Sequence, residues 1–259
     1  MNNVLHARTS GQGPDMVLLH GLFGQGSNLG GVSRALTSDF RVHCLDLPDH
    51  GRSPWLTKAS LVTYAAAVRE WMQSNALPSA HVLGHSLGGK VAMELALTAP
   101  ERVGKLIVAD IAPVTYTEQH LQILKALQQV VDRRCETRTE AEALLSEVIE
   151  DPGVVGYLLM SLEQADGIYR WRFNLTGLAD GYGRLRQAPS EAAPFQGPTL
   201  FLKGGNSAYI QAAHEQEIRR RFPGSQLVAL QGAGHWLHVD QPDQFNGAVR
   251  TFLLATETR

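Results

Sequence analysis

The sequence predicts an α/β fold in which a mostly parallel central sheet is flanked by helices. Short apolar runs, rich in Val, Leu and Ile, recur at residues 16–20, 42–45, 81–83, 106–109, 199–202 and 226–230. Runs this short, without polar alternation, are typical of strands that are buried on both faces. Helical patterns lie between them, for example at residues 64–75 and 88–99. Strands that alternate with helices indicate right-handed βαβ units and therefore a parallel sheet.

One long interval contains no strand-like run. Between residues 112 and 195 the apolar residues recur at helical spacing instead, in two stripes. The stripes are formed by Leu121, Leu124, Leu127 and Val131 and by Leu144, Leu145, Val148 and Ile149. Strand patterns resume at Thr199, so we expect one core domain, residues 1–111 and 196–259, with a helical lid inserted over 112–195.

Composition limits the class of partner. The 259 residues are 44% hydrophobic and 19% charged, with a formal charge of −2, which argues against a nucleic-acid or membrane partner that is bound mainly by charge. No stretch approaches the roughly 18 apolar residues of a spanning helix, and no secretory signal is evident. Cys44 and Cys135 fit no metal or redox spacing. We therefore expect a cytoplasmic protein without a metal site.

The string Gly84-His-Ser-Leu-Gly88 is the strongest indication of chemistry. It follows a buried run and precedes a helical pattern, and strand, sharp turn and helix form the setting of a nucleophilic serine. Glycines at 84 and 88 permit a close approach of backbone, and the helix N-terminus faces the developing negative charge. We expect Ser86 to be the nucleophile; the alternative is a serine in an ordinary loop between a strand and a helix.

A second glycine turn, His20-Gly-Leu-Phe-Gly24, comes directly after the first apolar run. A turn there would direct the backbone amide of Leu22 at the substrate oxyanion, with the amide of Leu87 as the second donor. The alternative is a glycine-rich connection without a catalytic role. We expect the two amides to form an oxyanion hole.

The candidate general base lies in the string Gly232-Ala-Gly-His-Trp-Leu-His238, after the last apolar run. A histidine on a glycine-flanked loop at this point suits the chain order serine, acid, histidine, so His235 is the expected base. His238 is expected to be structural. The turn Asp46-Leu-Pro-Asp-His-Gly-Arg-Ser53 is also interpreted as structural, because its residues suit a tight turn with local hydrogen bonds.

With these strings the chain resembles the α/β-hydrolases along nearly its whole length, and more narrowly the YbfF-type bacterial esterases. The likeness is also carried by the strings Asp110-Ile-Ala-Pro113, Trp171-Arg-Phe-Asn174 and Gly204-Gly-Asn-Ser207. The resemblance implies the α/β-hydrolase fold and hydrolysis of carboxylic esters or acyl thioesters, acyl-CoA included, through an acyl-enzyme on Ser86. It implies no cofactor and a small-molecule substrate as the partner.

The third member of the catalytic triad departs from the common pattern. Most of these hydrolases carry an aspartate in a Gly-x-x-Asp loop after the strand that corresponds to 199–202, where this chain has Ser207. Asp110, at the end of the neighbouring strand, is the expected acid, with Ser207 hydrogen-bonded into the same network; the alternative is that Asp110 only caps a turn. Asp240 lies closer to His235 in sequence, but its place before Gln-Pro is typical of a helix N-cap.

Bulky apolar residues suggest a substrate pocket for short to medium acyl groups. Tyr157, Trp171 and Phe173 of the inserted segment are expected to line it, with Phe23 and Trp236 beside the two active-site turns. The alternative is that the first three only form the core of the insertion. Two other functions stay open: other serine-dependent chemistry (C–C hydrolysis, lyase elimination or perhydrolysis), and a non-catalytic binding protein on the same scaffold. The sequence does not indicate an oligomeric state.

Overall fold

The computed structural model of the chain describes residues 4–255. Within them a seven-stranded sheet has the order β1-β3-β2-β4-β5-β8-β9, and only the pair β1–β3 is antiparallel. The strands are β1 (Ala7–Ser10), β2 (Asp15–Leu19), β3 (Arg41–Leu45), β4 (Ala80–His85), β5 (Val103–Ala109), β8 (Thr199–Gly204) and β9 (Ser225–Leu230). The expected mostly parallel sheet is confirmed.

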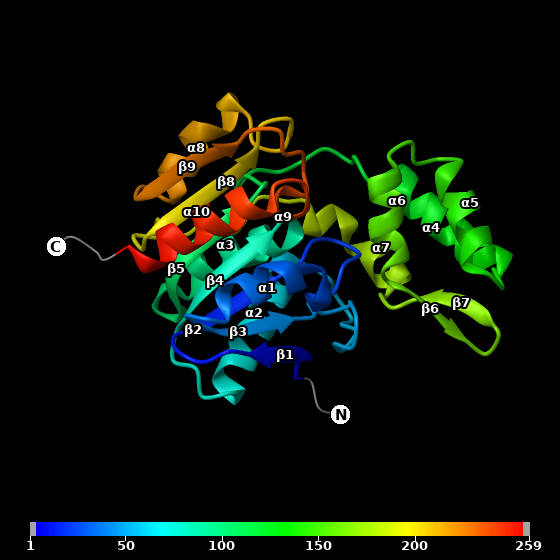
Figure 1. The fold of residues 1–259 in the computed structure, drawn as a ribbon, viewed down its shortest axis with the longest axis horizontal. Helices are drawn as coiled ribbons and strands as arrows, with labels where there is room; N and C mark the ends of the chain where they lie inside the picture. Colours follow the sequence, from blue (N-terminus) through cyan, green and yellow to red (C-terminus); the bar gives the residue numbers. More distant parts are fainter. Residues whose placement is uncertain (1–3, 256–259) are drawn as a thin grey trace.

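Helices cover both faces of this sheet (Figure 1). One face carries α1 (Gly30–Leu36) and α10 (Pro242–Leu254); the other carries α2 (Leu61–Ser74), α3 (Leu87–Thr98) and α8 (Glu215–Arg221). The shorter helices are α9 (Leu237–Asp240) and the 3-10 helices Gly26–Leu29, Pro100–Arg102 and Ala212–His214. No helix in the described range is long and apolar enough to cross a membrane.

The two-sided cover explains the uninterrupted apolar runs. In β2, Val17 and Leu19 pack into the core on the α2 and α3 side, whereas Met16 and Leu18 pack into the core on the α1 and α10 side. All four side chains are fully buried, because alternate residues of a strand point to opposite faces and both faces are covered.

The two edges of the sheet depart from the expectations. The strand β9 was expected to be buried on both faces, but Leu227 and Val228 are 38% and 37% exposed. The expectation was wrong because β9 is the last strand of the sheet, where helices cover it incompletely. The strand β1 at the other edge was not predicted, since its four residues are polar or small and form no apolar run.

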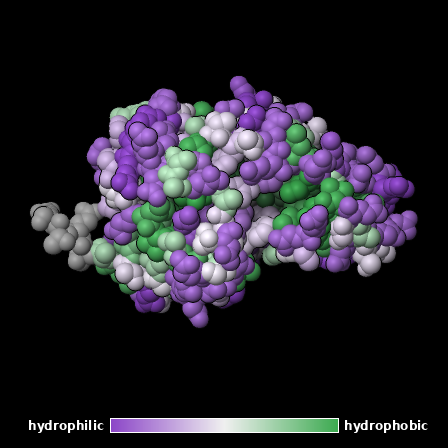
Figure 2. Space-filling view, turned by 90° about the horizontal axis from the view of Figure 1, so that it is seen from above, coloured by the Kyte–Doolittle hydropathy of each residue, from purple (hydrophilic) through white to green (hydrophobic). Residues whose placement is uncertain are grey.

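The segment 112–195, which we call the insertion, lies between β5 and β8 and projects to one side of the sheet (Figure 1). Its elements are α4 (Leu121–Arg133), α5 (Arg138–Ser146), α6 (Pro152–Leu159), β6 (Leu162–Ala165), β7 (Ile168–Trp171) and α7 (Leu175–Leu185). Apolar residues gather on its surface in the view from above (Figure 2).

The hairpin of β6 and β7 corrects the expectation of an interval without strands. Its turn is Asp166-Gly167, and both residues have positive φ, 53° and 82°. This is the conformation of a two-residue hairpin turn, for which Asp-Gly is a favoured sequence, so the signal was present in the chain. The strands are only four residues long, which kept their apolar pattern weak.

The expected helical stripes are also partly wrong. In α4 the buried face contains Leu124, Leu127 and Val130, whereas Leu121 and Val131 are exposed. The second stripe extends beyond its helix, since α5 ends at Ser146. Helical spacing located these helices but did not determine which residues at the margins of the apolar face are covered.

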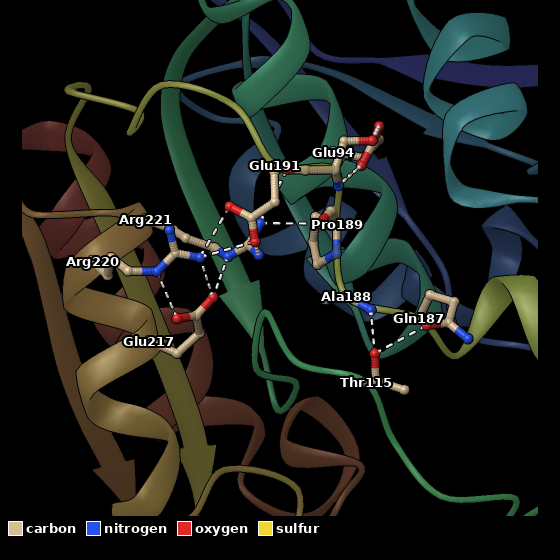
Figure 3. Close-up of polar contacts among 10 residues, drawn as sticks. Glu94, Thr115, Gln187, Ala188, Pro189, Glu191, Glu217, Arg220 and Arg221 are labelled. Atoms are coloured by element: carbon tan, nitrogen blue, oxygen red, sulfur yellow. Dashed lines mark hydrogen bonds and ion pairs between the residues drawn. The ribbon is translucent and has the colours of Figure 1, made fainter.

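The return from the insertion to β8 is held to two core helices (Figure 3). The N–H and hydroxyl of Ser190 donate to the carboxylate of Glu94 in α3, both at 2.7 Å. The buried guanidinium of Arg221 at the end of α8 donates to the carbonyl of Pro189 at 3.0 Å and pairs with Glu191. These contacts fix the segment that carries the chain out of the insertion.

Two glycines allow α3 to begin directly against the sheet. A Cβ placed on Gly88 would lie 2.2 Å from the carbonyl oxygen of Leu19, and one placed on Gly84 would lie 2.1 Å from the carbonyl oxygen of Gly88. Both contacts would be with backbone, which cannot move aside without shifting β2 or α3. The close approach forces the chain between β4 and α3 into one sharp turn at Ser86.

We predict that Gly88→Ala lowers the free energy of unfolding by about 3 kcal/mol or more, because the added methyl group overlaps the backbone of β2. Gly183→Ala is the matched control: a Cβ there, in the last turn of α7, meets nothing within 4 Å. Helix propensity alone should make that variant up to about 1 kcal/mol more stable. Urea unfolding of both variants measures the difference, and equal stability of Gly88→Ala and wild type would contradict the described packing.

Candidate active site

Ser86 occupies the turn between β4 and α3. Its backbone has φ 53° and ψ −116°, a strained conformation for a residue with a side chain. Its N–H donates to the carbonyl of Ala109 at the end of β5, at 3.0 Å. The serine is half-buried and lines two cavities. A strained serine between a strand and a helix is the geometry of a nucleophile elbow.

The imidazole of His235 reaches Asp110. The Nδ1 atom of His235 lies 2.8 Å from Oδ2 of Asp110, which directly follows β5 and is fully buried. The carboxylate also accepts the N–H of Gly204 at 3.0 Å and the hydroxyl of Ser207. Because the carboxylate is the acceptor, Nδ1 carries the proton and Nε2 is left as the basic nitrogen. The expected hydrogen bond from Ser207 is therefore present.

The His235 ring is held on two further sides. The ring of Tyr209 stacks on the imidazole with centroids 4.0 Å apart. The backbone carbonyl of His235 accepts a hydrogen bond from Nε2 of His85 at 2.8 Å. Burial, together with the nearby charges of His235 and His238, holds the pKa of His85 well below its usual range. His85 is thus a neutral donor that supports the loop of the candidate base.

The Leu22 amide is oriented by the carbonyl on the other side of the same peptide bond. The carbonyl of Gly21 accepts from Nδ1 of His20 at 2.8 Å and from the N–H of Gly24 at 3.1 Å. In a trans peptide the N–H and the C=O point in opposite directions, so the Leu22 N–H points away from those two partners. Gly21 itself approaches Ser86: a Cβ on Gly21 would lie 3.5 Å from Cβ of Ser86.

The Leu87 amide is oriented by α3. The carbonyl of Ser86 accepts the N–H of Lys90 at 3.1 Å, as the first hydrogen bond of the helix. The N–H of Leu87 in the same peptide unit points the other way, out of the helix N-terminus, where helical N–H groups have no partner within the helix. Leu22 and Leu87 lie together with Ser86 on the wall of one cavity. The two amides can therefore serve a common oxyanion.

Two cavities meet at Ser86 and share Leu22 and Tyr209. The larger one has a volume of about 330 Å³ and is lined by His235 and by three of the predicted pocket residues, Phe23, Tyr157 and Trp236. The smaller one has a volume of about 50 Å³ and extends from Ser86 toward Lys90. The site thus has room for substituents on both sides of a scissile bond.

Trp171 and Phe173 do not line either cavity, contrary to the expectation from the sequence. Their rings stack on each other with centroids 5.2 Å apart, and the indole N–H of Trp171 donates to the carbonyl of Leu127 at 3.0 Å. Trp171 is buried within the insertion, whereas Phe173 is buried between the insertion and the core domain, with its ring centroid 5.2 Å from that of Phe23. Their hydrophobicity and size suggested a place in the substrate pocket. These properties do not indicate the side to which the two rings point.

Several cavity residues were not predicted. They are Gln119, His120, Ile123, Val154 and Leu158 of the insertion and Tyr209 after β8. No local motif marks these positions; Tyr209 alone carried a signal, because it lies two residues after Ser207 in the loop that was assigned to the triad network. The remaining residues meet only when the insertion folds across the ends of the strands.

The other acidic candidates have structural partners. Asp46 accepts the N–H of Gly26 at 2.7 Å and that of Arg52 at 2.9 Å, which supports its interpretation as a turn residue. Asp240 does not cap α10 as expected, because Gln241 is the N-cap residue. Its carboxylate instead accepts the N–H of Gly234 at 2.7 Å and so anchors the loop that carries the candidate base.

Buried histidines surround the site in neutral form. Nε2 of His50 accepts the N–H of Phe23 at 3.1 Å, and burial is the main cause that lowers the pKa of His50 to about 3. Burial, and then the charge of His235, lowers the pKa of His238 to about 4. The ring of His238 packs against that of Phe245. The folded chain therefore excludes protons that these residues bind when unfolded.

Known proteins resemble the chain over most of its length. The sequence profile of a family described as "Alpha/beta hydrolase family" matches residues 16–248. The chain is 38% identical to the mouse sn-1-specific diacylglycerol lipase ABHD11 over 248 residues, 93% of this chain and 81% of the lipase. It is 35% identical to esterase YbfF of Escherichia coli K12 over 240 residues, 92% of each chain. A solved structure called "Marine microorganism esterase" superimposes with a TM-score of 0.93 at 35% identity, over 97% of this chain and all of the other.

We predict that acid destabilises the fold through His238. As the pH falls from about 6.5 to about 4, the unfolded chain takes up a proton that the buried ring refuses, so the free energy of unfolding falls. In His238→Leu the fall between about pH 7 and about pH 4.5 should be smaller by roughly 2 kcal/mol. Urea unfolding at the two pH values measures it. Phe245→Leu is the control, because it reduces the adjacent packing without changing a titrating group, and it should shift the free energy of unfolding equally at both pH values. A wild-type pH dependence in His238→Leu would refute the role of His238.

Proposed function

Because the chain belongs to the α/β-hydrolase family, we propose that it is a serine esterase that hydrolyses carboxylic esters or acyl thioesters through an acyl-enzyme on Ser86. The observation that carries this proposal is the convergence of three strand ends. Ser86 follows β4, Asp110 follows β5, and His235 lies after β9 with its ring bonded to Asp110. The esterase and lipase relatives support ester bonds as the target.

The first half-reaction transfers the acyl group to the enzyme. Nε2 of His235 takes the proton of the Ser86 hydroxyl while the Ser86 oxygen forms a bond to the acyl carbon of the substrate. The carbonyl electron pair moves onto the oxygen, which the amides of Leu22 and Leu87 stabilise. When the tetrahedral intermediate collapses, the bond to the alcohol or thiol breaks and the leaving group takes the proton from His235. Asp110 orients the ring and stabilises its protonated form.

The second half-reaction returns the enzyme to its starting state. Water enters from the side that the alcohol or thiol has left. His235 takes one proton of the water as the water oxygen bonds to the acyl carbon. Collapse releases the carboxylic acid, and the proton passes back to Ser86. Neither step needs a cofactor, because every group in the cycle is a side chain or a backbone amide of this chain.

The insertion is proposed to be the lid of this site. Tyr157 of α6 lines the large cavity and its hydroxyl donates to the carbonyl of Leu22 at 3.1 Å. Ser161 donates to the carbonyl of Phe23 at 2.7 Å. The insertion therefore touches the loop that carries one oxyanion donor, and short to medium acyl groups on esters or acyl-CoA thioesters are the proposed substrate range. A binding protein that has lost its triad is not favoured, because Asp110 supplies the carboxylate that position 207 lacks.

We predict that Ser86→Ala lowers kcat on an aryl acetate by about 10⁴ to 10⁶, because it removes the nucleophile. A fluorophosphonate probe should label wild type covalently and leave Ser86→Ala unlabelled. Intact mass spectrometry, with circular dichroism as the control for folding, measures both. A folded variant that keeps a tenth of the activity would refute the proposal.

We predict that Asp110→Asn lowers kcat by up to about 10⁴ at neutral pH. The amide oxygen can still accept the N–H of Gly204, but the amide nitrogen would face Nδ1 of His235 and favour the wrong tautomer. Ser207→Ala removes one hydrogen bond to the same carboxylate and should cost only about tenfold. Steady-state kinetics on one ester compares the two variants, and equal losses would argue against Asp110 as the acid.

A further inference from the structure

The two cavities at Ser86 differ in both size and neighbours. The large cavity is lined by His235 and Trp236, whereas the small cavity is lined by Leu87, Ile111 and Leu185 but does not reach His235. The small cavity has a volume of about 50 Å³, which is enough for a small substituent. The large cavity, of about 330 Å³, holds several times more.

The stereochemistry of acyl transfer assigns one substituent to each cavity. In the tetrahedral intermediate the oxyanion points toward the two amides, and the leaving oxygen or sulfur must lie beside Nε2 of His235 to receive its proton. The acyl substituent takes the remaining direction, away from that ring. Since His235 lines only the large cavity, the leaving group extends into the large cavity and the acyl group into the small one.

We infer that the preferred substrates combine a short acyl group with a bulky apolar alcohol or thiol, as the unequal volumes of the two cavities indicate. This inference rests on the proposed function and refines it. The insertion shapes both sides of the site, because Ile123, Val154 and Leu158 line the large cavity and Tyr182 and Leu185 line the small one.

One wall of the small cavity includes a fixed group. Lys90 is buried there, and its Nζ donates to the carbonyls of Val114 at 2.7 Å, of Arg186 at 3.0 Å and of Gln187. An ammonium group has three N–H donors, so none is left for a ligand. The three carbonyls come from both ends of the insertion, and the wall cannot retreat for a longer chain without breaking them. The small cavity is therefore an apolar stop for the acyl group.

The large cavity favours an uncharged leaving group. Tyr157 and Trp236 both line it, and their rings pack against each other with centroids 5.6 Å apart. Among the described residues that line it there is no lysine or arginine to pair with a phosphate. Aromatic and aliphatic walls of this kind bind apolar alcohols by burial of surface.

Two isomeric esters test the assignment directly. Phenethyl acetate has a short acyl group and a bulky alcohol, and methyl hydrocinnamate reverses them with the same atoms and a similarly reactive alkyl ester. We expect kcat/KM of the wild-type protein for phenethyl acetate to exceed that for methyl hydrocinnamate by about tenfold or more. Both are measured by titration of the acid released, with Ser86→Ala as the blank.

Three variants locate the preference in the two cavities. Leu185→Ala enlarges the small cavity and should raise kcat/KM for methyl hydrocinnamate at least about threefold, with Leu185→Val as the milder change if the first does not fold. Ile123→Ala, in the large cavity, should lower kcat/KM for phenethyl acetate without this gain. Leu144→Ala is a matched control in the insertion, since Leu144 lines neither cavity, and should leave the ratio unchanged.

The outcomes separate the inference from the proposed function. Hydrolysis of methyl hydrocinnamate at an equal or higher kcat/KM, dependent on Ser86, would overturn the assignment of the cavities and leave the esterase proposal intact. Failure of the wild-type protein to hydrolyse either isomer or any aryl acetate in a Ser86-dependent way would overturn the esterase proposal itself.

Discussion

The approach of α3 to the ends of β2 and β4 is the constraint on which the rest of the site depends. Gly84 and Gly88 leave no room for a methyl group between the helix and the strands. The resulting turn holds Ser86 in a conformation that side chains rarely adopt and points the amide of Leu87 out of the helix. The proposed nucleophile and one proposed oxyanion donor are thus placed by backbone packing, before any other side chain is considered.

The displaced acid follows from the register of the parallel sheet. Ala109 in β5 pairs with Leu202 in β8, so the two strands end side by side. A carboxylate after either strand can reach the same imidazole, and here Asp110 takes that place while the β8 side contributes the Gly204 N–H and the Ser207 hydroxyl. These two donors and Nδ1 of His235 compensate the cost of burying the carboxylate. The aspartate therefore lies after β5, while the loop after β8 still contacts it through Gly204 and Ser207.

The insertion is joined to the core at the points that shape the site. Asn174 donates to the buried carboxylate of Asp49, which also accepts the hydroxyl of Tyr64 in α2. Lys90 gathers carbonyls from both ends of the insertion onto α3, four residues beyond the nucleophile. Because these contacts are buried, the insertion is held to the same helix that positions Ser86. Its inner face lines both cavities at Ser86.

The sequence by itself determined the fold class and the positions of Ser86, His235 and the two amide donors, because glycine turns between apolar runs and helices are local signals. It also indicated Asp110, through its place at a strand end. The tertiary structure alone decided that Trp171 and Phe173 are buried away from the two cavities, that Asp240 anchors the His235 loop, and that two unequal cavities meet at Ser86. These features depend on which faces meet across long distances in the chain, and residue type and spacing do not specify that.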